Sequence, residues 1–231
     1  MRDKSLQTVS DRKSIDQFLN QVKELAVPQA QQGRLIFALD ATASRKPTWD
    51  QACQLQSELF LATQDLGGLA VQLCYYRGFG EFVAAPWLSQ TQPLLQRMNG
   101  VDVLGGHTQI RKVLRHAVEE TRKQRVSAVV FIGDCCEEAV DDLCQLAGEL
   151  GLLRTPVFIF QEGQDNAAEQ AFRQISHLSG GAYAPFDLNS PGILKDLLAA
   201  VAIYATGGPK ALEQHAKQQG QHVKLLTRQM T

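Results

Sequence analysis

Residues 35–44 decide the fold, and they run Leu-Ile-Phe-Ala-Leu-Asp-Ala-Thr-Ala-Ser. Five successive apolar residues are typical of a strand that is buried on both faces of a parallel sheet. The strand ends at Asp40, and oxygen-bearing side chains then occupy every second position, at Asp40, Thr42 and Ser44. Ligands of parallel α/β proteins bind beyond the carboxyl ends of such strands. The stretch therefore predicts a central parallel strand followed by a candidate binding loop.

The rest of the chain alternates short apolar runs with amphipathic segments, the pattern of a Rossmann-like, doubly wound α/β sheet with helices on both faces. The runs 69–76 and 81–85 are joined by four residues, too few for a parallel crossover. They predict a hairpin, and with it one antiparallel edge strand in a mostly parallel sheet. Further strands are expected over 126–132, 156–160 and 182–186, and helices over 48–66, 94–98, 108–123, 137–150, 167–178 and 191–204.

Composition along the chain predicts three parts. Residues 33–206 contain the alternating pattern and form the α/β domain. Residues 1–32 are expected to form an amphipathic helix, with an apolar stripe from Ile15 to Leu25, followed by a glutamine-rich linker. Residues 207–231 form a polar, basic tail to which the sequence assigns no fixed position.

Charge and cysteine content narrow the choice of partners and compartment. Lysine and arginine total 23 and aspartate and glutamate total 24, so the net charge is −1. No strong field attracts nucleic acid or an anionic membrane, and neither is expected as a partner. The first residues lack the apolar stretch of a secretory signal, and the five cysteines lack disulfide-framework spacing. These features predict a cytoplasmic protein with free thiols.

Two more oxygen-bearing residues stand at positions like that of Asp40. Thr108 begins a predicted helix after Gly105-Gly106, and Asp134 directly follows the predicted strand 126–132. Any one of these residues is equally well explained as a helix-capping group. If the three loops converge, however, they supply only oxygen ligands, which suit a hard cation, Mg²⁺ or Mn²⁺. The predicted metal ligands are Asp40, Thr42, Ser44, Thr108 and Asp134.

This combination resembles the metal-ion-dependent adhesion site (MIDAS) of von Willebrand factor A (VWA) domains. That pattern is Asp-x-Ser-x-Ser, a distant threonine at a helix start, and an aspartate after a central strand. The resemblance covers roughly residues 34–204 and implies a VWA fold. It also implies that Thr42 and Ser44 ligate directly, Thr108 directly or through water, and Asp40 and Asp134 mainly through water. A sixth position is then left for a carboxylate from a partner.

The chain departs from the family pattern at three places. Thr42 replaces the first serine, which keeps the hydroxyl, and His107 separates the glycine pair from Thr108. Cys135-Cys136 replaces the glycine that usually follows the aspartate. Adjacent cysteines lack the spacing of a zinc or redox site, so they are expected to be half-buried thiols. The acidic residues 137, 138, 141 and 142 are expected to open a helix, whose dipole favours negative charge.

The sequence thus predicts a protein-binding adaptor module that depends on a divalent cation, rather than an enzyme. Its partner would present an acidic residue, and family analogy alone suggests an AAA-type ATPase or another assembly. One alternative is a Mg²⁺-dependent phosphohydrolase of the haloacid-dehalogenase type. That class needs a second aspartate two residues after the first as general acid, where this chain has Thr42. The other alternative is a VWA scaffold that binds through its flanks without metal.

Overall fold

The computed structural model describes residues 33–45, 69–187, 191–218 and 220–230. The predicted N-terminal helix and linker and the predicted helix over 48–66 lie outside these residues. Within the described ranges the strands form a single sheet in the order β3-β2-β1-β4-β5-β6. Every neighbouring pair is parallel except β2 and β3, so the predicted mostly parallel sheet with one antiparallel edge strand is confirmed. The strands are β1 (Gly33–Asp40), β2 (Leu69–Arg77), β3 (Glu81–Ala84), β4 (Ala128–Gly133), β5 (Val157–Glu162) and β6 (Ala182–Phe186).

Strand β1 lies at the centre of the sheet, all of its residues are buried, and its middle part, residues 35–39, is apolar. Its residues alternate between two hydrophobic layers, since successive side chains of a strand point to opposite faces. Leu35, Phe37 and Leu39 belong to one layer, and Ile36 and Ala38 belong to the other. Both faces of the sheet are therefore covered, as the continuous apolar run predicted.

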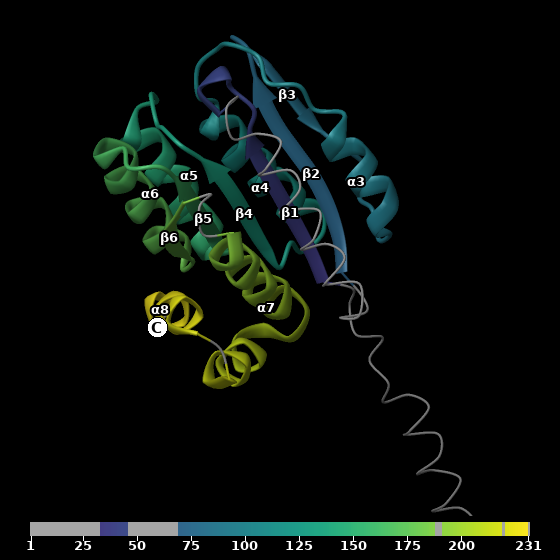
Figure 1. Cartoon of the computed structure of the whole chain (residues 1–231), viewed down its shortest axis with the longest axis vertical. Coiled ribbons are helices and arrows are strands. Elements are labelled where there is room, and N and C mark those ends of the chain that lie inside the picture. Colours follow the sequence, from purple (N-terminus) through teal and green to yellow (C-terminus); the bar gives the residue numbers. More distant parts are fainter. Residues whose placement is uncertain (1–32, 46–68, 188–190, 219, 231) are drawn as a thin grey trace, which may run out of the picture. The chain divides into compact units, whose positions relative to one another are not determined.

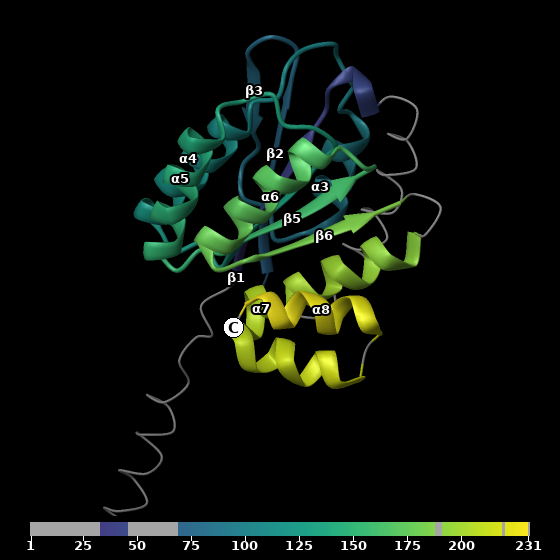
Figure 2. The same ribbon diagram turned by 90° about the vertical axis from the view of Figure 1, so that its left-hand side faces the viewer.

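Helices cover the two faces as separate groups (Figures 1 and 2). Helices α4 (Ile110–Lys123), α5 (Val140–Leu152) and α6 (Asn166–Ser179) pack on the layer that contains Ile36 and Ala38. Helices α3 (Thr91–Asn99), α7 (Pro191–Gln218) and α8 (Gln221–Gln229) pack on the opposite layer. A short 3₁₀ helix, η1 (Ala43–Arg45), follows β1.

Two helices begin later than the sequence predicted. Helix α4 begins at Ile110 rather than Thr108, and α5 begins at Val140 rather than Glu137. Thr108 and Glu137 instead lie in loops at the carboxyl end of the sheet. The apolar periodicity of both helices was correctly located, but periodicity does not mark where helical hydrogen bonding starts.

The residues after 206 fold back against the sheet. Helix α7 is interrupted at Gly208, where φ is +72°, and α8 then places Val223 and Leu226 in the core. Gln229 of α8 exchanges hydrogen bonds with the backbone of Tyr183, near the start of β6. Ala205 of α7 closely approaches Gly33, the first residue of β1. Ala205 of α7 and Gln229 of α8 therefore lie near the amino ends of β1 and β6, respectively.

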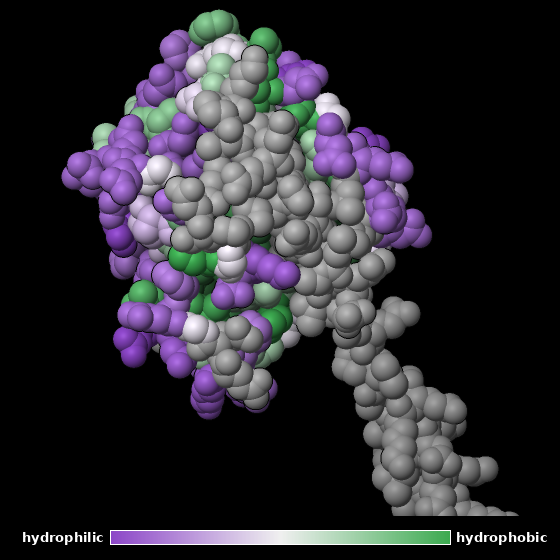
Figure 3. All heavy atoms as spheres, in the orientation of Figure 1, coloured by the Kyte–Doolittle hydropathy of each residue, from purple (hydrophilic) through white to green (hydrophobic). Residues whose placement is uncertain are grey.

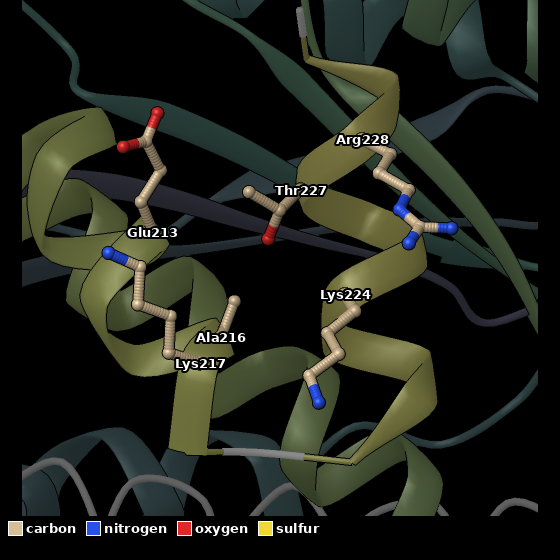
Figure 4. Close-up of a pocket in the computed structure, with 6 residues that line it drawn as sticks. All are labelled: Glu213, Ala216, Lys217, Lys224, Thr227 and Arg228. Atoms are coloured by element: carbon tan, nitrogen blue, oxygen red, sulfur yellow. The ribbon is translucent and has the colours of Figure 1, made fainter.

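An open pocket of about 380 Å³ lies between the second part of α7 and α8. Three of its lining side chains are basic: Lys217, which lies beside Glu213 on α7, and Lys224 and Arg228, which lie across from them on α8 (Figure 4). None of the helices in the described part of the chain combines the length and apolarity needed to cross a membrane.

Candidate metal centre

The order of the strands places a crevice beside the carboxyl end of β1. After β1 the chain adds β2 and β3 on one side, and it later adds β4, β5 and β6 on the other. Connections that leave in opposite directions open a crevice between the two strand ends, where ligands of α/β proteins bind. Asp40 is the last residue of β1, and Asp134 directly follows β4. The two predicted carboxylates thus flank this crevice.

The loop after β1 is held together by its own polar side chains. The Thr42 backbone N–H donates to Asp40 Oδ1 at 2.8 Å, and the Thr42 and Ser44 hydroxyls are 3.0 Å apart. The alternation that the sequence showed therefore turns all three oxygen-bearing side chains toward one another. This arrangement is what a loop needs if it is to surround a cation.

Asp40 is fully buried, and its carboxylate is supported by a neighbouring strand. Tyr76 of β2 is its register partner, and the Tyr76 hydroxyl donates to Asp40 Oδ2 at 2.8 Å. Burial raises the pKa of the Asp40 carboxyl, and the charge of Asp134 acts in the same direction. Hydrogen bonds from Thr42 and Tyr76 lower that pKa in part. A divalent cation would stabilise the ionised form directly.

Asp134 and Cys135 complete a compact cluster with Asp40. One oxygen of each carboxylate and the sulfur of Cys135 all lie within 4.8 Å of one another. Asp134 Oδ1 is buried and has no hydrogen-bond partner among the described residues. A buried carboxylate oxygen without a donor is costly, and a bound ion removes that cost. The donor set therefore fits a metal ion, although Cys135 was not predicted to belong to it.

Thr108 makes its contacts on the Asp134 side of the crevice. Its hydroxyl accepts from the backbone N–H of Glu137 at 3.0 Å, and its own N–H donates to Glu137 Oε2 at 3.0 Å. The structure thus joins Asp40, Thr42 and Ser44 by hydrogen bonds and places Asp134 beside them, while Thr108 is bonded to the loop that follows Asp134. The assignment of these five residues as ligands stays a prediction.

Glu138 caps a different helix from the one the sequence suggested. Glu138 accepts hydrogen bonds from the backbone N–H groups of Ile110 and Arg111, the latter at 3.0 Å, at the start of α4. Gln109, which precedes α4, makes no side-chain cap of its own. Only Asp141 and Asp142 lie in the first turn of α5. The prediction that Glu137 and Glu138 open their own helix is therefore wrong.

Replacement of Glu138 by alanine should destabilise the fold by about 1–2 kcal/mol, because two N–H groups at the start of α4 lose their acceptor. Glu138→Gln retains one acceptor oxygen and should have a smaller effect. Urea-induced unfolding followed by circular dichroism measures both. An alanine variant as stable as wild type would show that α4 does not depend on this cap.

Arg45 was not considered at the sequence level, yet it holds the loop after β1 in place. Its buried guanidinium donates to the backbone carbonyl of Asp40 at 2.6 Å and to Glu162, the last residue of β5, at 3.0 Å. A salt bridge of 2.9 Å accompanies the second contact. A buried arginine that is paired in this way fixes the backbone on which Asp40, Thr42 and Ser44 are carried.

Apolar side chains lie exposed next to this loop. Leu104, which is 52% exposed, pairs with the loop through the hydrogen bond from its N–H to the Ala41 carbonyl at 3.0 Å. Phe79, at the turn between β2 and β3, is 82% exposed, and its ring meets that of His107 edge-on with centroids 5.2 Å apart. Figure 3 shows hydrophobic colour at this end of the molecule, near its top. We call Phe79, Leu104 and His107 the rim.

Neither a known protein family nor a curated protein matches the sequence. Solved structures do match the fold. An aerotolerance-related membrane protein from Bacteroides fragilis is 16% identical with a TM-score of 0.57, over 71% of this chain and 98% of that chain. The SpRpn10 VWA domain is 14% identical with a TM-score of 0.57, over 71% and 93%.

A third solved structure with this fold carries a metal. Proximal thread matrix protein 1 from the mussel byssus, with a zinc-occupied MIDAS motif, is 13% identical with a TM-score of 0.55. The match covers 73% of this chain and 45% of that one. At such identities the likeness establishes the fold alone. The described part of this chain has the Rossmann-like VWA fold, as the sequence resemblance predicted.

Proposed function

We propose that this protein is an interaction module that holds one divalent cation between Asp40 and Asp134 and uses it to bind a protein partner. The observation that carries the proposal is the cluster at the crevice, in which Asp40 is buried and one Asp134 oxygen is shielded and unpartnered among the described residues. Two carboxylates this close together repel each other when both are ionised, and a cation between them would remove that repulsion. The hydroxyls of Thr42 and Ser44 add neutral ligands, and the oxygen ligands taken alone favour Mg²⁺ or Mn²⁺.

The partner is proposed to contribute an acidic side chain. Neutral hydroxyls and aspartates acting through water neutralise the ion only in part, so a carboxylate from outside completes the coordination shell. The rim beside the loop supports protein binding at the same place, because aromatic side chains are enriched at interfaces and exposed apolar surface marks them. An AAA-type ATPase or another assembly as partner, and a cytoplasmic location, remain part of the proposal.

An interaction role is favoured over phosphate hydrolysis by the surroundings of Thr42. Haloacid-dehalogenase chemistry needs an acid at this position to protonate the leaving group. Here the position carries a hydroxyl that is bonded within its own loop. The second alternative, binding through the flanks without metal, is favoured by one observation, the basic pocket between α7 and α8.

The two binding modes make opposite predictions in a capture experiment. The tagged full-length protein is incubated with native lysate in Mg²⁺ or in EDTA, in parallel with Asp40→Asn and with a Lys217→Glu/Lys224→Glu double variant. Retention of the partner should fall at least tenfold in EDTA and in Asp40→Asn, as expected when a central charge-to-metal contact is lost. The double variant should retain the partner. The reverse pattern would establish the α7–α8 pocket as the binding site and contradict the proposal.

A further inference from the structure

The cluster at the crevice contains a ligand type that the oxygen-only interpretation does not use. The sulfur of Cys135 lies within 4.8 Å of oxygens from both Asp40 and Asp134. Zinc binds cysteine sulfur at about 2.3 Å and carboxylate oxygen at about 2.0–2.2 Å, which separates two tetrahedral ligands by roughly 3.6 Å. Small side-chain rotations would therefore let one ion contact all three groups.

The neighbouring cysteine has a different environment. Cys136 packs against the hydrophobic layer beneath α4, α5 and α6, and it is not one of the three residues of the cluster. Two adjacent thiols with different surroundings imply different roles. Only the first stands where a metal would bind.

The buried Asp134 oxygen supplies a second, independent observation. Asp134 Oδ1 lacks a donor among the described residues although it is shielded from water. Asp40 beside it is fully buried. Buried carboxylates are ordinarily paired with cations or with several donors. Asp40 already accepts from Thr42 and Tyr76, so the unmet need is at the Asp134 oxygen, and a cation bound by both carboxylates and the thiolate would meet it.

A sulfur ligand changes which cation the site prefers. Mg²⁺ requires near-octahedral oxygen ligands and binds thiolates poorly, whereas Zn²⁺ and Co²⁺ accept mixed sulfur and oxygen sets. We propose that Cys135 is a direct thiolate ligand, and that the site accordingly selects Zn²⁺ or Co²⁺ over Mg²⁺ and Mn²⁺. Binding replaces the thiol proton by the metal and releases the proton to solvent. This inference rests on the proposed metal-dependent function and specifies the ion that serves it.

Cobalt provides a direct probe, because thiolate ligation gives a near-ultraviolet charge-transfer band that oxygen ligands do not give. The full-length protein, Cys135→Ser and the matched control Cys136→Ser are each titrated with Co²⁺. Wild type and Cys136→Ser should show the band, and Cys135→Ser should lose it. Competition should show Zn²⁺ affinity reduced at least tenfold in Cys135→Ser, with Mg²⁺ affinity changed less than threefold. A band that survives in Cys135→Ser would overturn the inference.

A second measurement needs no substitution and so does not depend on a variant folding. Wild-type protein is alkylated under native conditions with Zn²⁺, with Mg²⁺ or with neither, and peptide masses report each cysteine. Zn²⁺ should protect Cys135 but not Cys136, and Mg²⁺ should protect neither. If Co²⁺ binding requires Asp40 but leaves Cys135 reactive, the assignment of Cys135 as a ligand is wrong, while the proposed metal-dependent function stands. If no ion binds wild type more tightly than Asp40→Asn, the proposed function fails as well.

Discussion

Asp40→Asn should lower the affinity for a divalent cation at least 100-fold while leaving the fold intact. The asparagine amide can still accept from the Thr42 N–H and still hydrogen-bond with the Tyr76 hydroxyl, so both contacts of the wild-type carboxylate survive. What disappears is one of the two charges that face the ion. A 100-fold loss corresponds to about 2.8 kcal/mol, close to the lower end of the roughly 3–5 kcal/mol that removing one partner of a buried charge pair costs. Calorimetric titration with Mn²⁺ and Zn²⁺ measures it.

The control for this experiment is Asp102→Asn. Asp102 is exposed on the loop before Leu104, so the same chemical change there should leave metal affinity unaltered. Thermal unfolding in EDTA should show that Asp40→Asn remains folded. Equal metal affinity for wild type and Asp40→Asn would show that the carboxylate of Asp40 is structural and that the cation, if bound, lies elsewhere.

The sheet could be predicted from the sequence because its signals are local. The run from Leu35 to Leu39 is apolar on both faces, and the four residues between the runs 69–76 and 81–85 leave room only for a hairpin. The structure places β4 beside β1, which brings Asp40 and Asp134 together. Local patterning located both strand ends, but it left their convergence as a condition that only the family resemblance implied.

The rest of the site depends on contacts between residues far apart in sequence. Glu138 caps a helix that begins 28 positions earlier, and Arg45 joins β1 to Glu162, 117 positions later. Tyr76 was part of the predicted strand 69–76 and was given no role at the site, but its hydroxyl supports Asp40. This contact could have been predicted only from the strand register, which pairs Tyr76 with Asp40, the last residue of β1. Cys135 was set aside because its sequence neighbours lack zinc spacing, whereas its spatial neighbours are the two aspartates.

Gly106→Ala should destabilise the protein by about 2–4 kcal/mol and weaken metal binding as well. A Cβ atom at Gly106 would lie 1.9 Å from the carbonyl oxygen of Gly78 and 2.2 Å from its carbonyl carbon. These are backbone atoms, so neither loop can avoid the clash by a side-chain rotation. The loop from Leu104 to Thr108 would have to move away from the β2–β3 turn.

That movement should reach the candidate metal centre through Leu104, whose N–H donates to the Ala41 carbonyl at 3.0 Å, beside Thr42. The matched control is Gly105→Ala, since a Cβ there meets nothing within 4 Å. It should change the free energy of unfolding by no more than about 0.5 kcal/mol, as surface substitutions usually do. Urea unfolding of both variants measures the effect on stability, and Mn²⁺ titration measures the effect on metal affinity. If Gly106→Ala were as stable as Gly105→Ala, the two loops would not approach each other closely in solution. The position of Thr108 relative to the crevice would then not be fixed by this contact.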